Sequence, residues 1–189
     1  ETTSNISFGT ALAKSIFLAR RLKKLWFGQN MVGIFMPPSV GGALVNYAAF
    51  LSDKVPVNLN YTLSESGIAS CSSQCGIRTV VTSRKFLGKI KLTPPGELIY
   101  LEDLAEKPAF SEKVVAFFMA QFFPMRLLER TLISNRKSEI GNRKSLDTLA
   151  TVIFSSVITG EPKGVMLSQF NLLENVAQCG EVINLDHSQ

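Results

Sequence analysis

The sequence predicts an α/β protein with a doubly wound, mainly parallel sheet and helices on both faces. Short apolar runs rich in β-branched residues alternate along the chain with segments of helical periodicity. The apolar runs are continuous, which is typical of strands buried on both faces. Strands are expected at 31–36, 55–59, 79–82, 99–101 and 151–155. In such sheets ligands collect at the carboxyl ends of the strands.

The first part of the chain predicts an amphipathic helix, a strand and a second helix. Residues 10–27 carry apolar side chains at helical spacing, with basic residues largely on the other face, which we expect to be solvated. The apolar run 31–36 ends at Pro37 and Pro38, because proline has no backbone N–H to donate to a neighbouring strand. A helix is expected over 42–52.

Two later helices have recognisable ends. Ser64 is the expected N-cap of a helix over 64–75, and Gly76 is its expected C-terminal stop. A final helix is expected over 168–182, where the Ser168 hydroxyl can cap the first turn. Both of these helices follow a predicted strand, as expected for the crossovers of a parallel sheet.

The net charge of +5 is concentrated in one segment of the chain. Residues 107–144 hold eight Lys or Arg against three Asp or Glu, and the remainder is balanced at 12 of each. Since a nucleic-acid surface needs cations spread along a face, we do not expect nucleic acid as a partner. With 189 residues and 46% hydrophobic content, the chain can bury the core of one domain, or of part of one.

The same basic segment interrupts the α/β pattern. Residues 114–123 are apolar all round, Pro124 follows, and residues 125–137 become amphipathic and basic. A run of about ten to twelve apolar residues is too short to span a bilayer. Two interpretations stay open: a basic, apolar helix buried against other parts of the protein, or an interfacial segment at 114–137 on an anionic membrane surface.

The sequence offers little support for metal or nucleophilic chemistry. Cys71, Cys75 and Cys179 are odd in number, and the only histidine, His187, lies near the end of the chain. Free, buried thiols in a reducing cytosol are the simplest interpretation, and neither a metal site nor a disulfide is expected. A single histidine also removes most routes to a Ser-His-Asp or Cys-His mechanism. Residues 1–30 show no secretory signal peptide.

A loop rich in hydroxyl groups follows the last predicted strand. Residues 155–164 read SSVITGEPKG. Hydroxyl and backbone N–H groups donate to phosphate oxygens, and a lysine adds a positive charge. The loop is not the common P-loop, because Gly160 is not followed at the right spacing by Gly-Lys-Ser/Thr. The segment therefore predicts a phosphate-binding loop of another kind.

This loop resembles the signature of the AMP-forming acyl- and aryl-activating enzymes, Ser-Ser-Gly-Thr-Thr-Gly-x-Pro-Lys-Gly. Seven of the nine specified positions match, but Val157 replaces a glycine and Ile158 replaces a serine or threonine. The flanks look most like the acyl-acyl-carrier-protein synthetase half of bacterial bifunctional phospholipid-recycling proteins, at Pro37-Pro38-Ser39, Asn58-Leu59-Asn60-Tyr61 and Gln74-Cys75-Gly76-Ile77. The resemblance extends from about Ile6 to Asp186. It implies that residues 1–189 are the N-terminal part of an adenylation (AMP-binding) domain.

The resemblance implies a fatty-acid ligase that works in two steps. A fatty-acid carboxylate attacks the α-phosphate of ATP, with Mg²⁺ present, and gives an acyl-adenylate and pyrophosphate. A thiol of acyl carrier protein or CoA then takes the acyl group, in phospholipid acyl recycling. Carried over position by position, the donors to the β- and γ-phosphates are Ser155, Ser156, Thr159 and Lys163, and the backbone approaches them at Gly160 and Gly164.

The resemblance also implies which activity the 189-residue chain lacks on its own. The family's magnesium- and adenine-contacting motif, its ribose-binding aspartate and its late catalytic lysine all lie downstream of these residues. No catalytic residue is therefore assigned, and the 189-residue chain alone is expected to show no ATP–pyrophosphate exchange. The expected location is the cytoplasm, or the inner face of the cytoplasmic membrane.

An alternative function rests on the departures from the family pattern. If the family glycine takes φ > 0, a β-branched Val157 is unfavourable there, and Ile158 removes a hydroxyl beside the phosphates. Gln169 also stands where relatives usually carry histidine. The chain could thus belong to a non-catalytic membrane-peripheral or scaffold module that descends from such an enzyme. The sequence leaves this alternative open.

Overall fold

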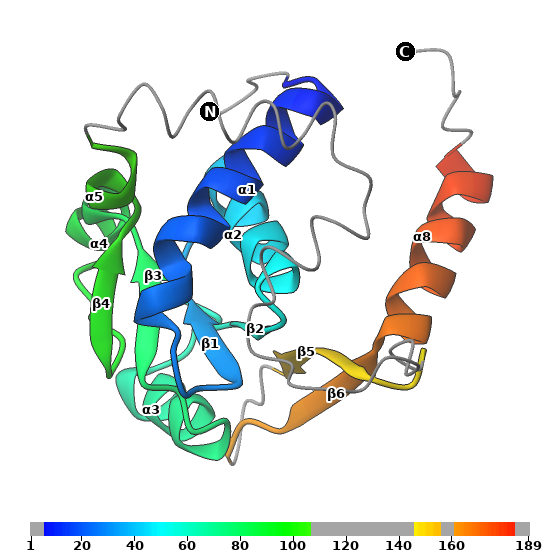
Figure 1. Ribbon diagram of the computed structural model, residues 1–189. Helices are drawn as coiled ribbons and strands as arrows, with labels where there is room; N and C mark the ends of the chain where they lie inside the picture. Colours follow the sequence, from blue (N-terminus) through cyan, green and yellow to red (C-terminus); the bar gives the residue numbers. More distant parts are fainter. Residues whose placement is uncertain (1–5, 107–145, 156–160, 184–189) are drawn as a thin grey trace.

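One six-stranded sheet organises the part of the chain that the structure describes. The structure is a computed structural model, and it describes residues 6–106, 146–155 and 161–183. The sheet has the order β4-β3-β1-β2-β5-β6 (Figure 1). Its strands are β1 (Met31–Ile34), β2 (Val55–Asn58), β3 (Thr79–Thr82), β4 (Glu97–Tyr100), β5 (Leu149–Phe154) and β6 (Gly164–Ser168).

The five strands predicted from the sequence are present and run parallel to one another. Their ends differ from the predicted ones by two residues at most. β1 lies in the middle, where Gly33 is opposite Val57 of β2 on one side and Val80 of β3 on the other. The doubly wound, mainly parallel α/β fold is therefore confirmed.

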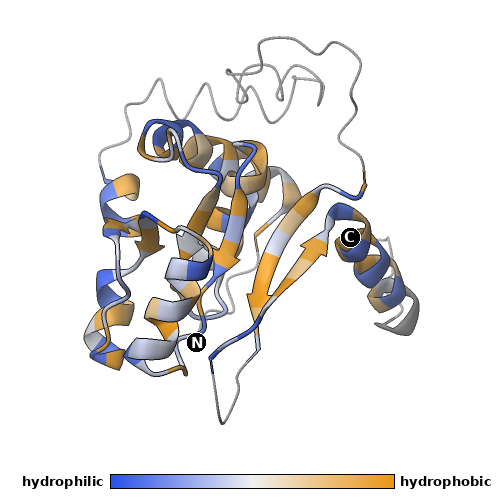
Figure 2. Ribbon diagram, turned by 90° about the horizontal axis from the view of Figure 1, so that it is seen from below, coloured by the Kyte–Doolittle hydropathy of each residue, from blue (hydrophilic) through white to orange (hydrophobic). Residues whose placement is uncertain are grey.

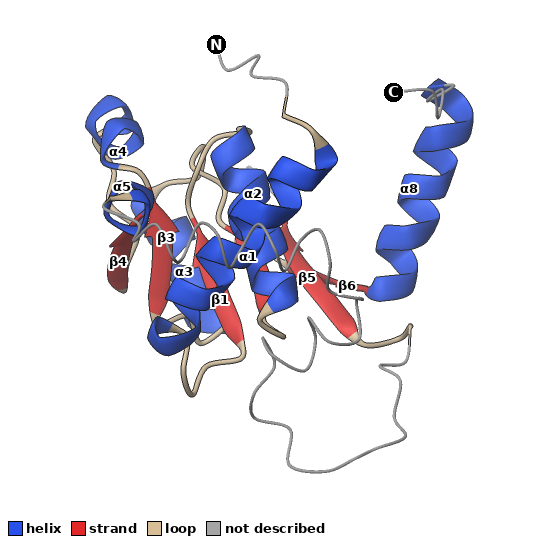
Figure 3. Ribbon diagram, turned by 45° about the horizontal axis from the view of Figure 1, so that its top comes forward, coloured by secondary structure: helices blue, strands red, loops and turns tan. Residues whose placement is uncertain are grey.

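Helices α1 (Phe8–Leu25) and α2 (Val40–Leu51) cover one face of the sheet (Figures 1 and 3). The predicted apolar stripe of the first helix is the buried one, and Ile16, Leu22 and Trp26 are fully buried. They join a core cluster with β1 and with Val45 of α2. The short α5 (Leu101–Ala105) packs at the border of this cluster through Leu104.

The opposite face carries α3 (Glu65–Gln74) and α4 (Arg84–Ile90). Ile68 of α3 and Phe86 of α4 pack with the buried side chains of β2, β3 and β5. The Phe86 ring contacts the rings of Phe35 and Tyr61, with centroids 5.7 and 5.3 Å away. Helices on both faces are thus confirmed, and the strands are mainly in the hydrophobic colour in Figure 2. The last helix is α8 (Gln169–Ile183).

Small hydroxyl side chains begin most of these helices. The Ser64 hydroxyl accepts a hydrogen bond from the backbone N–H of Gly67 at 3.2 Å, and Gly76 has φ +58° just beyond the helix. The Ser168 hydroxyl likewise accepts from the third backbone N–H of α8 at 3.3 Å. All three predictions of helix ends are confirmed. The same N-cap, which we did not predict, occurs at Ser7, Ser39 and Ser83.

Three elements were missing from the sequence prediction. α4 and α5 have only seven and five residues, too few to display a helical period. β6 is a five-residue strand that runs antiparallel to β5, and its pairing comes from a hairpin that the apolar pattern alone does not reveal. The sheet therefore gains one antiparallel edge strand beyond the expected parallel set.

The prediction of buried free thiols is correct for one cysteine and wrong for another. Cys71 is buried in α3, and this burial, followed by the influence of Cys75, raises the pKa of its thiol to about 11. Cys75 is half-buried. Cys179 is exposed, because most of α8 lacks a covering element among the described residues.

The structure bears only in part on the expectations for the basic segment and for metal binding, because it does not describe every residue. The basic segment 107–144 lies outside them, so its buried and interfacial interpretations both stay predictions. None of the described helices is long and apolar enough to cross a membrane. Within residues 6–106, 146–155 and 161–180, no three His, Cys, Asp or Glu side chains gather in a way that could hold a metal ion.

A glycine in the central strand gives a stability prediction. A Cβ at Gly33 would lie 2.9 Å from Val80 Cγ2 and 3.0 Å from Ile77 Cγ2, inside a fully packed layer. Gly33→Ala should therefore lower the free energy of unfolding by about 1–3 kcal/mol, measured by urea denaturation. The matched control is Gly88→Ala on the exposed side of α4, where nothing lies within 4 Å. The control should be neutral or stabilising, and equal losses in both variants would contradict the packing argument.

Candidate functional site

The predicted phosphate loop connects β5 to the antiparallel β6. Phe154 is opposite Gly164 at the end of the ladder. One step further, the backbone N–H of Ser155 donates to the carbonyl of Lys163 at 3.1 Å, and its hydroxyl reaches the same oxygen at 3.5 Å. The loop is therefore closed at its base by strand pairing. It begins at the carboxyl end of a parallel strand, where α/β sheets bind ligands.

The structure brings together three of the six predicted site residues. Ser155, Lys163 and Gly164 form the base of the loop. The other three predicted residues, and both departures from the family signature, lie outside the described residues: Ser156, Val157, Ile158, Thr159 and Gly160. The phosphate-binding role of all six therefore stays a prediction.

Lys163 is suitable as an anion-binding group. Its side chain is exposed, and no ion pair of Lys163 with an acidic side chain occurs within the described ranges. Its carbonyl is held by Ser155, so the backbone is fixed while the ammonium group extends into solvent. Because the backbone is already ordered, phosphate binding would cost this residue side-chain rotamer entropy but little backbone entropy.

Gly164 has a packing role that the sequence did not suggest. A Cβ at this position would lie 3.1 Å from the Phe154 ring and 3.1 Å from Val152 Cγ1. Both neighbours belong to the buried side of β5. The absence of a side chain thus leaves room for Phe154 and Val152 where β6 begins.

The second arm of the loop is anchored to α3. Gln74 donates a hydrogen bond from Nε2 to the carbonyl of Pro162 at 3.0 Å, and the Pro162 side chain is buried. Sequence reasoning missed Gln74 as a positioning residue, because its partner lies 88 positions away. In the sequence, only the family resemblance marks residues 74–77 as noteworthy.

A groove of about 590 Å³ adjoins the start of the loop, at the carboxyl ends of β1, β2 and β5. Ile153 and Phe154 form one wall, and Pro37 and Tyr61 contribute to the others. Two asparagines in the groove bond each other: Asn46 donates to Asn58 at 3.1 Å and receives a bond of 2.9 Å in return. The groove is mainly apolar with a few amide groups, which is typical of small-molecule sites.

Gln169, where relatives usually carry histidine, lies at the other end of the β5–β6 hairpin. Its backbone N–H donates to Thr148, the residue before β5. Its side chain lines a separate cavity of about 180 Å³ together with Lys54, whose pKa is lowered by burial and raised to a smaller extent by Asp53. Because β6 runs antiparallel to β5, this end is remote from the loop base. Within the described residues, Gln169 therefore forms no hydrogen bond with the three site residues at the loop base.

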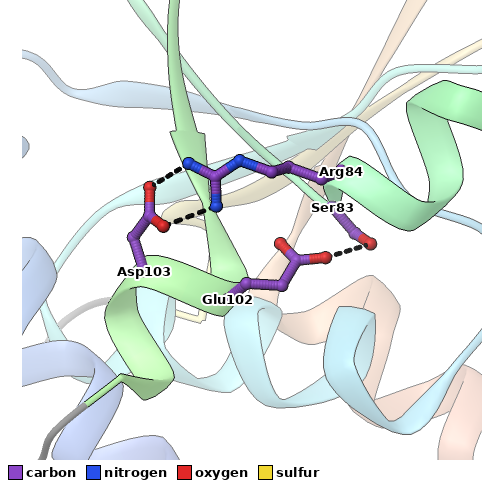
Figure 4. Close-up of polar contacts among 4 residues, drawn as sticks. All are labelled: Ser83, Arg84, Glu102 and Asp103. Atoms are coloured by element: carbon purple, nitrogen blue, oxygen red, sulfur yellow. Dashed lines mark hydrogen bonds and ion pairs between the residues drawn. The ribbon is translucent and has the colours of Figure 1, made fainter.

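A second polar cluster joins α4 to α5 beyond the ends of β3 and β4 (Figure 4). Arg84 binds both carboxylate oxygens of Asp103, at 2.5 and 2.7 Å, and stacks over the Tyr100 ring. Ser83 donates to Glu102 at 2.7 Å. Burial raises the pKa of Glu102, but the bond from Ser83 and nearby backbone N–H groups outweigh it and lower the pKa. Arg84 and Asp103 compensate each other's charge, whereas the buried Oε2 of Glu102 has no hydrogen-bond partner within the described residues. Because these contacts join α4 to α5, we assign this cluster a structural role.

Comparison with solved structures supports the same fold. Over its full length the chain is similar to O-succinylbenzoate Coenzyme A synthetase (MenE) from Bacillus subtilis in complex with AMP, with a TM-score of 0.68 at 19% identity, covering 42% of that chain. It is similar to VinN with a TM-score of 0.65 at 15% identity, over 97% of this chain and 44% of VinN. It is also similar to Mycobacterium tuberculosis fatty acyl CoA synthetase, with a TM-score of 0.56 at 20% identity, over 88% of this chain and 30% of that one.

These TM-scores establish a shared fold, and the chain spans less than half the length of each of these proteins. The family assignment comes from a separate comparison. The AMP-binding enzyme family matches residues 1–188, which is almost the whole chain. That match includes the loop between β5 and β6, residues 155–164, and the parallel sheet from which the loop extends. The chain belongs to the AMP-binding enzyme family.

Proposed function

We propose that this chain is part of an ATP-dependent, AMP-forming fatty-acid ligase, with residues 155–164 as its phosphate-binding loop. The observation that carries the proposal is the loop base, where Ser155 and Lys163 are joined at the carboxyl end of β5. Family membership supports it. Solved relatives support it as well, because MenE has been determined with ATP and magnesium ion and with its acyl-adenylate intermediate.

In this proposal the residues of the chain act by positioning and by charge. The Lys163 ammonium and the Ser155 hydroxyl hold phosphate oxygens, and the hydroxyls of Ser156 and Thr159 add donors from the same loop. Gly160 and Gly164 let the backbone come close. When bound, Mg²⁺ supplies further charge neutralisation at the phosphates. Holding the phosphates fixed lets a fatty-acid carboxylate attack the α-phosphate in line, with pyrophosphate as the leaving group.

The proposal continues to the acceptor and the metabolic role. The acyl group passes from the adenylate to the thiol of acyl carrier protein or CoA, in phospholipid acyl recycling. The flanking segments at 37–39, 58–61 and 74–77 support the carrier-protein acceptor through their resemblance. The M. tuberculosis fatty acyl CoA synthetase supports a fatty acid as the substrate class. The alternative, a non-catalytic module, is supported by Val157 and Ile158.

Lys163 gives the first test of this function. In the polypeptide encoded by the complete reading frame that contains this sequence, Lys163→Ala should lower fatty-acid-dependent ATP–pyrophosphate exchange by about 10-fold or more. A hydrogen bond to a charged group contributes about 1.5–3 kcal/mol, which corresponds to such a factor. Lys14→Ala, on the exposed face of α1, is the matched control and should leave the exchange unchanged.

The outcomes of this exchange assay separate the two functions. Exchange that is present and insensitive to Lys163→Ala would contradict the site. Absence of exchange with every fatty-acid length would favour the non-catalytic module. Where exchange occurs, transfer of a radiolabelled acyl group to acyl carrier protein, compared with CoA, identifies the acceptor.

The two loop departures give a second prediction in the same polypeptide. Val157→Gly together with Ile158→Thr should raise adenylation mainly through a lower KM for ATP, because glycine restores backbone freedom and threonine returns a donor to the phosphates. Steady-state kinetics with varied ATP measure both constants. An unchanged KM and an unchanged kcat would show that the loop tolerates these residues and that Lys163 and the other hydroxyls suffice.

The basic segment gives a third prediction, since the proposed substrate class derives from membrane lipid. We propose that residues 114–137 bind anionic membrane surfaces. Each basic residue near such a surface contributes about 1 kcal/mol, so the chain should co-sediment with phosphatidylglycerol vesicles at low salt and less at high salt. Arg126→Glu with Arg130→Glu should weaken this binding. If the double variant binds as well as the unchanged chain, or if the chain does not bind at low salt, the buried-helix interpretation is favoured.

A further inference from the structure

The returning arm of the 155–164 loop packs against α3 before it enters β6. The start of β6 lies beside α3 in Figure 1. Pro162 is buried there, and its Cγ atom lies 3.7 Å from the position that a Cβ of Gly67 would take. Two helical turns further along α3, Gln74 Nε2 donates to the Pro162 carbonyl at 3.0 Å. A single face of α3 therefore receives both the ring and the carbonyl of Pro162.

The amide group of Gln74 is itself held in place. Its Nε2 atom also donates to Ser70 Oγ at 3.1 Å, one helical turn earlier. An amide nitrogen carries two N–H groups, so these two bonds use both of them. The second bond restricts the rotamers of a long side chain on an exposed part of α3. Gln74 therefore presents a fixed donor to the arm of the loop.

The bond from Gln74 ties this arm to an element outside the β5–β6 hairpin. The hairpin itself supplies strand pairing and the bond from the Ser155 N–H to the Lys163 carbonyl. Pairing fixes how far β6 lies from β5, but β6 is the last strand of the sheet and has no second neighbour among the described residues to fix its inclination. Proline has no N–H, so the carbonyl is the backbone group of Pro162 that a donor can hold. Gln74 holds it on the residue directly before Lys163.

The direction of the backbone at Lys163 decides where its ammonium group can reach. The side chain is exposed and long, so a small tilt of the arm at Pro162 gives a larger displacement of Nζ. A displacement of this kind weakens binding, because the correct placement must then be selected from more conformations. Both N–H groups of Gln74 are already engaged, so its effect on a phosphate passes through Lys163.

We propose that Gln74 is a positioning residue of the phosphate site, whose bond to the Pro162 carbonyl directs Lys163 toward the phosphates of bound ATP. The inference rests on the proposed function, because the position of Lys163 matters only if Lys163 binds phosphate. Correct placement helps ATP to bind before any covalent bond changes, so the effect falls on KM for ATP and little on kcat. KM for the fatty acid is independent of Gln74, because Lys163 does not hold the carboxylate.

Two variants of the polypeptide encoded by the complete reading frame test this inference. Gln74→Glu keeps the shape of the side chain but replaces the donor by a carboxylate oxygen, and Gln74→Met keeps the length without any N–H group. Each should raise KM for ATP in the pyrophosphate-exchange assay by about 2- to 10-fold, the factor expected for one hydrogen bond. The values of kcat, KM for the fatty acid and Tm should change little. Ser73→Ala, at the adjacent exposed position of α3, is the matched control and should alter none of them.

A double-variant cycle separates positioning from a general structural role. In a Lys163→Ala background, Gln74→Met should have little further effect on the Kd for ATP, measured by isothermal titration calorimetry. Equal effects of Gln74→Met with and without Lys163 would overturn the inference. An unchanged KM for ATP in both Gln74 variants would also overturn it, as would a loss of Tm together with a rise in both KM values.

These outcomes leave the proposed function intact, because they concern Gln74 alone. Exchange that is absent, or that is insensitive to Lys163→Ala, removes the proposed phosphate site and this inference with it. Exchange that depends on Lys163 but not on Gln74 overturns only the positioning role. The same set of assays therefore distinguishes a failure of the inference from a failure of the function on which it rests.

Discussion

Both faces of the parallel sheet must be removed from water, and this requirement positions the candidate site. β1, β2 and β3 are almost entirely buried, so helices have to cover them from two sides. The helices that connect consecutive strands return the chain to the starting end of the sheet, so these strands run in the same direction. Their carboxyl ends therefore meet at one edge, where the apolar groove and the start of the 155–164 loop lie side by side.

At that edge, pairing of β6 with β5 closes the base of the 155–164 loop. The hairpin brings the chain back beside β5, so that Gly164 lies opposite Phe154. It also places Lys163 where its carbonyl accepts a hydrogen bond from Ser155. Gly164 leaves room for the Phe154 ring where β6 begins, and Gln74 of α3 holds the returning arm. The same strand is the last in the sheet order, so the base of the candidate phosphate site depends on the edge strand of the sheet.

The sequence predicted those parts of the fold that rest on continuous apolar runs and on small helix-capping residues. The strands, the N-cap at Ser64 and the stop at Gly76 follow from local chemistry, and the structure confirms them. β6 and the Gln74–Pro162 bond depend on partners far apart in the sequence, which a local pattern does not contain. The exposure of Cys179 was mispredicted for the same reason, since burial depends on what covers α8. The chemistry of the loop residues and their family resemblance predicted the candidate site. The structure gives the positions of only Ser155, Lys163 and Gly164 among the predicted site residues.

The central claim is that the loop between β5 and β6 binds the phosphates of a nucleotide. Amide chemical shifts of the isotopically labelled chain, recorded by NMR during titration with Mg-ATP, test it most directly. The account predicts that the largest changes occur at Ser155, Lys163 and Gly164, with little change on α1 or α4. Changes confined to the basic face of α1, or none at the loop base when ATP is in large excess, would contradict it.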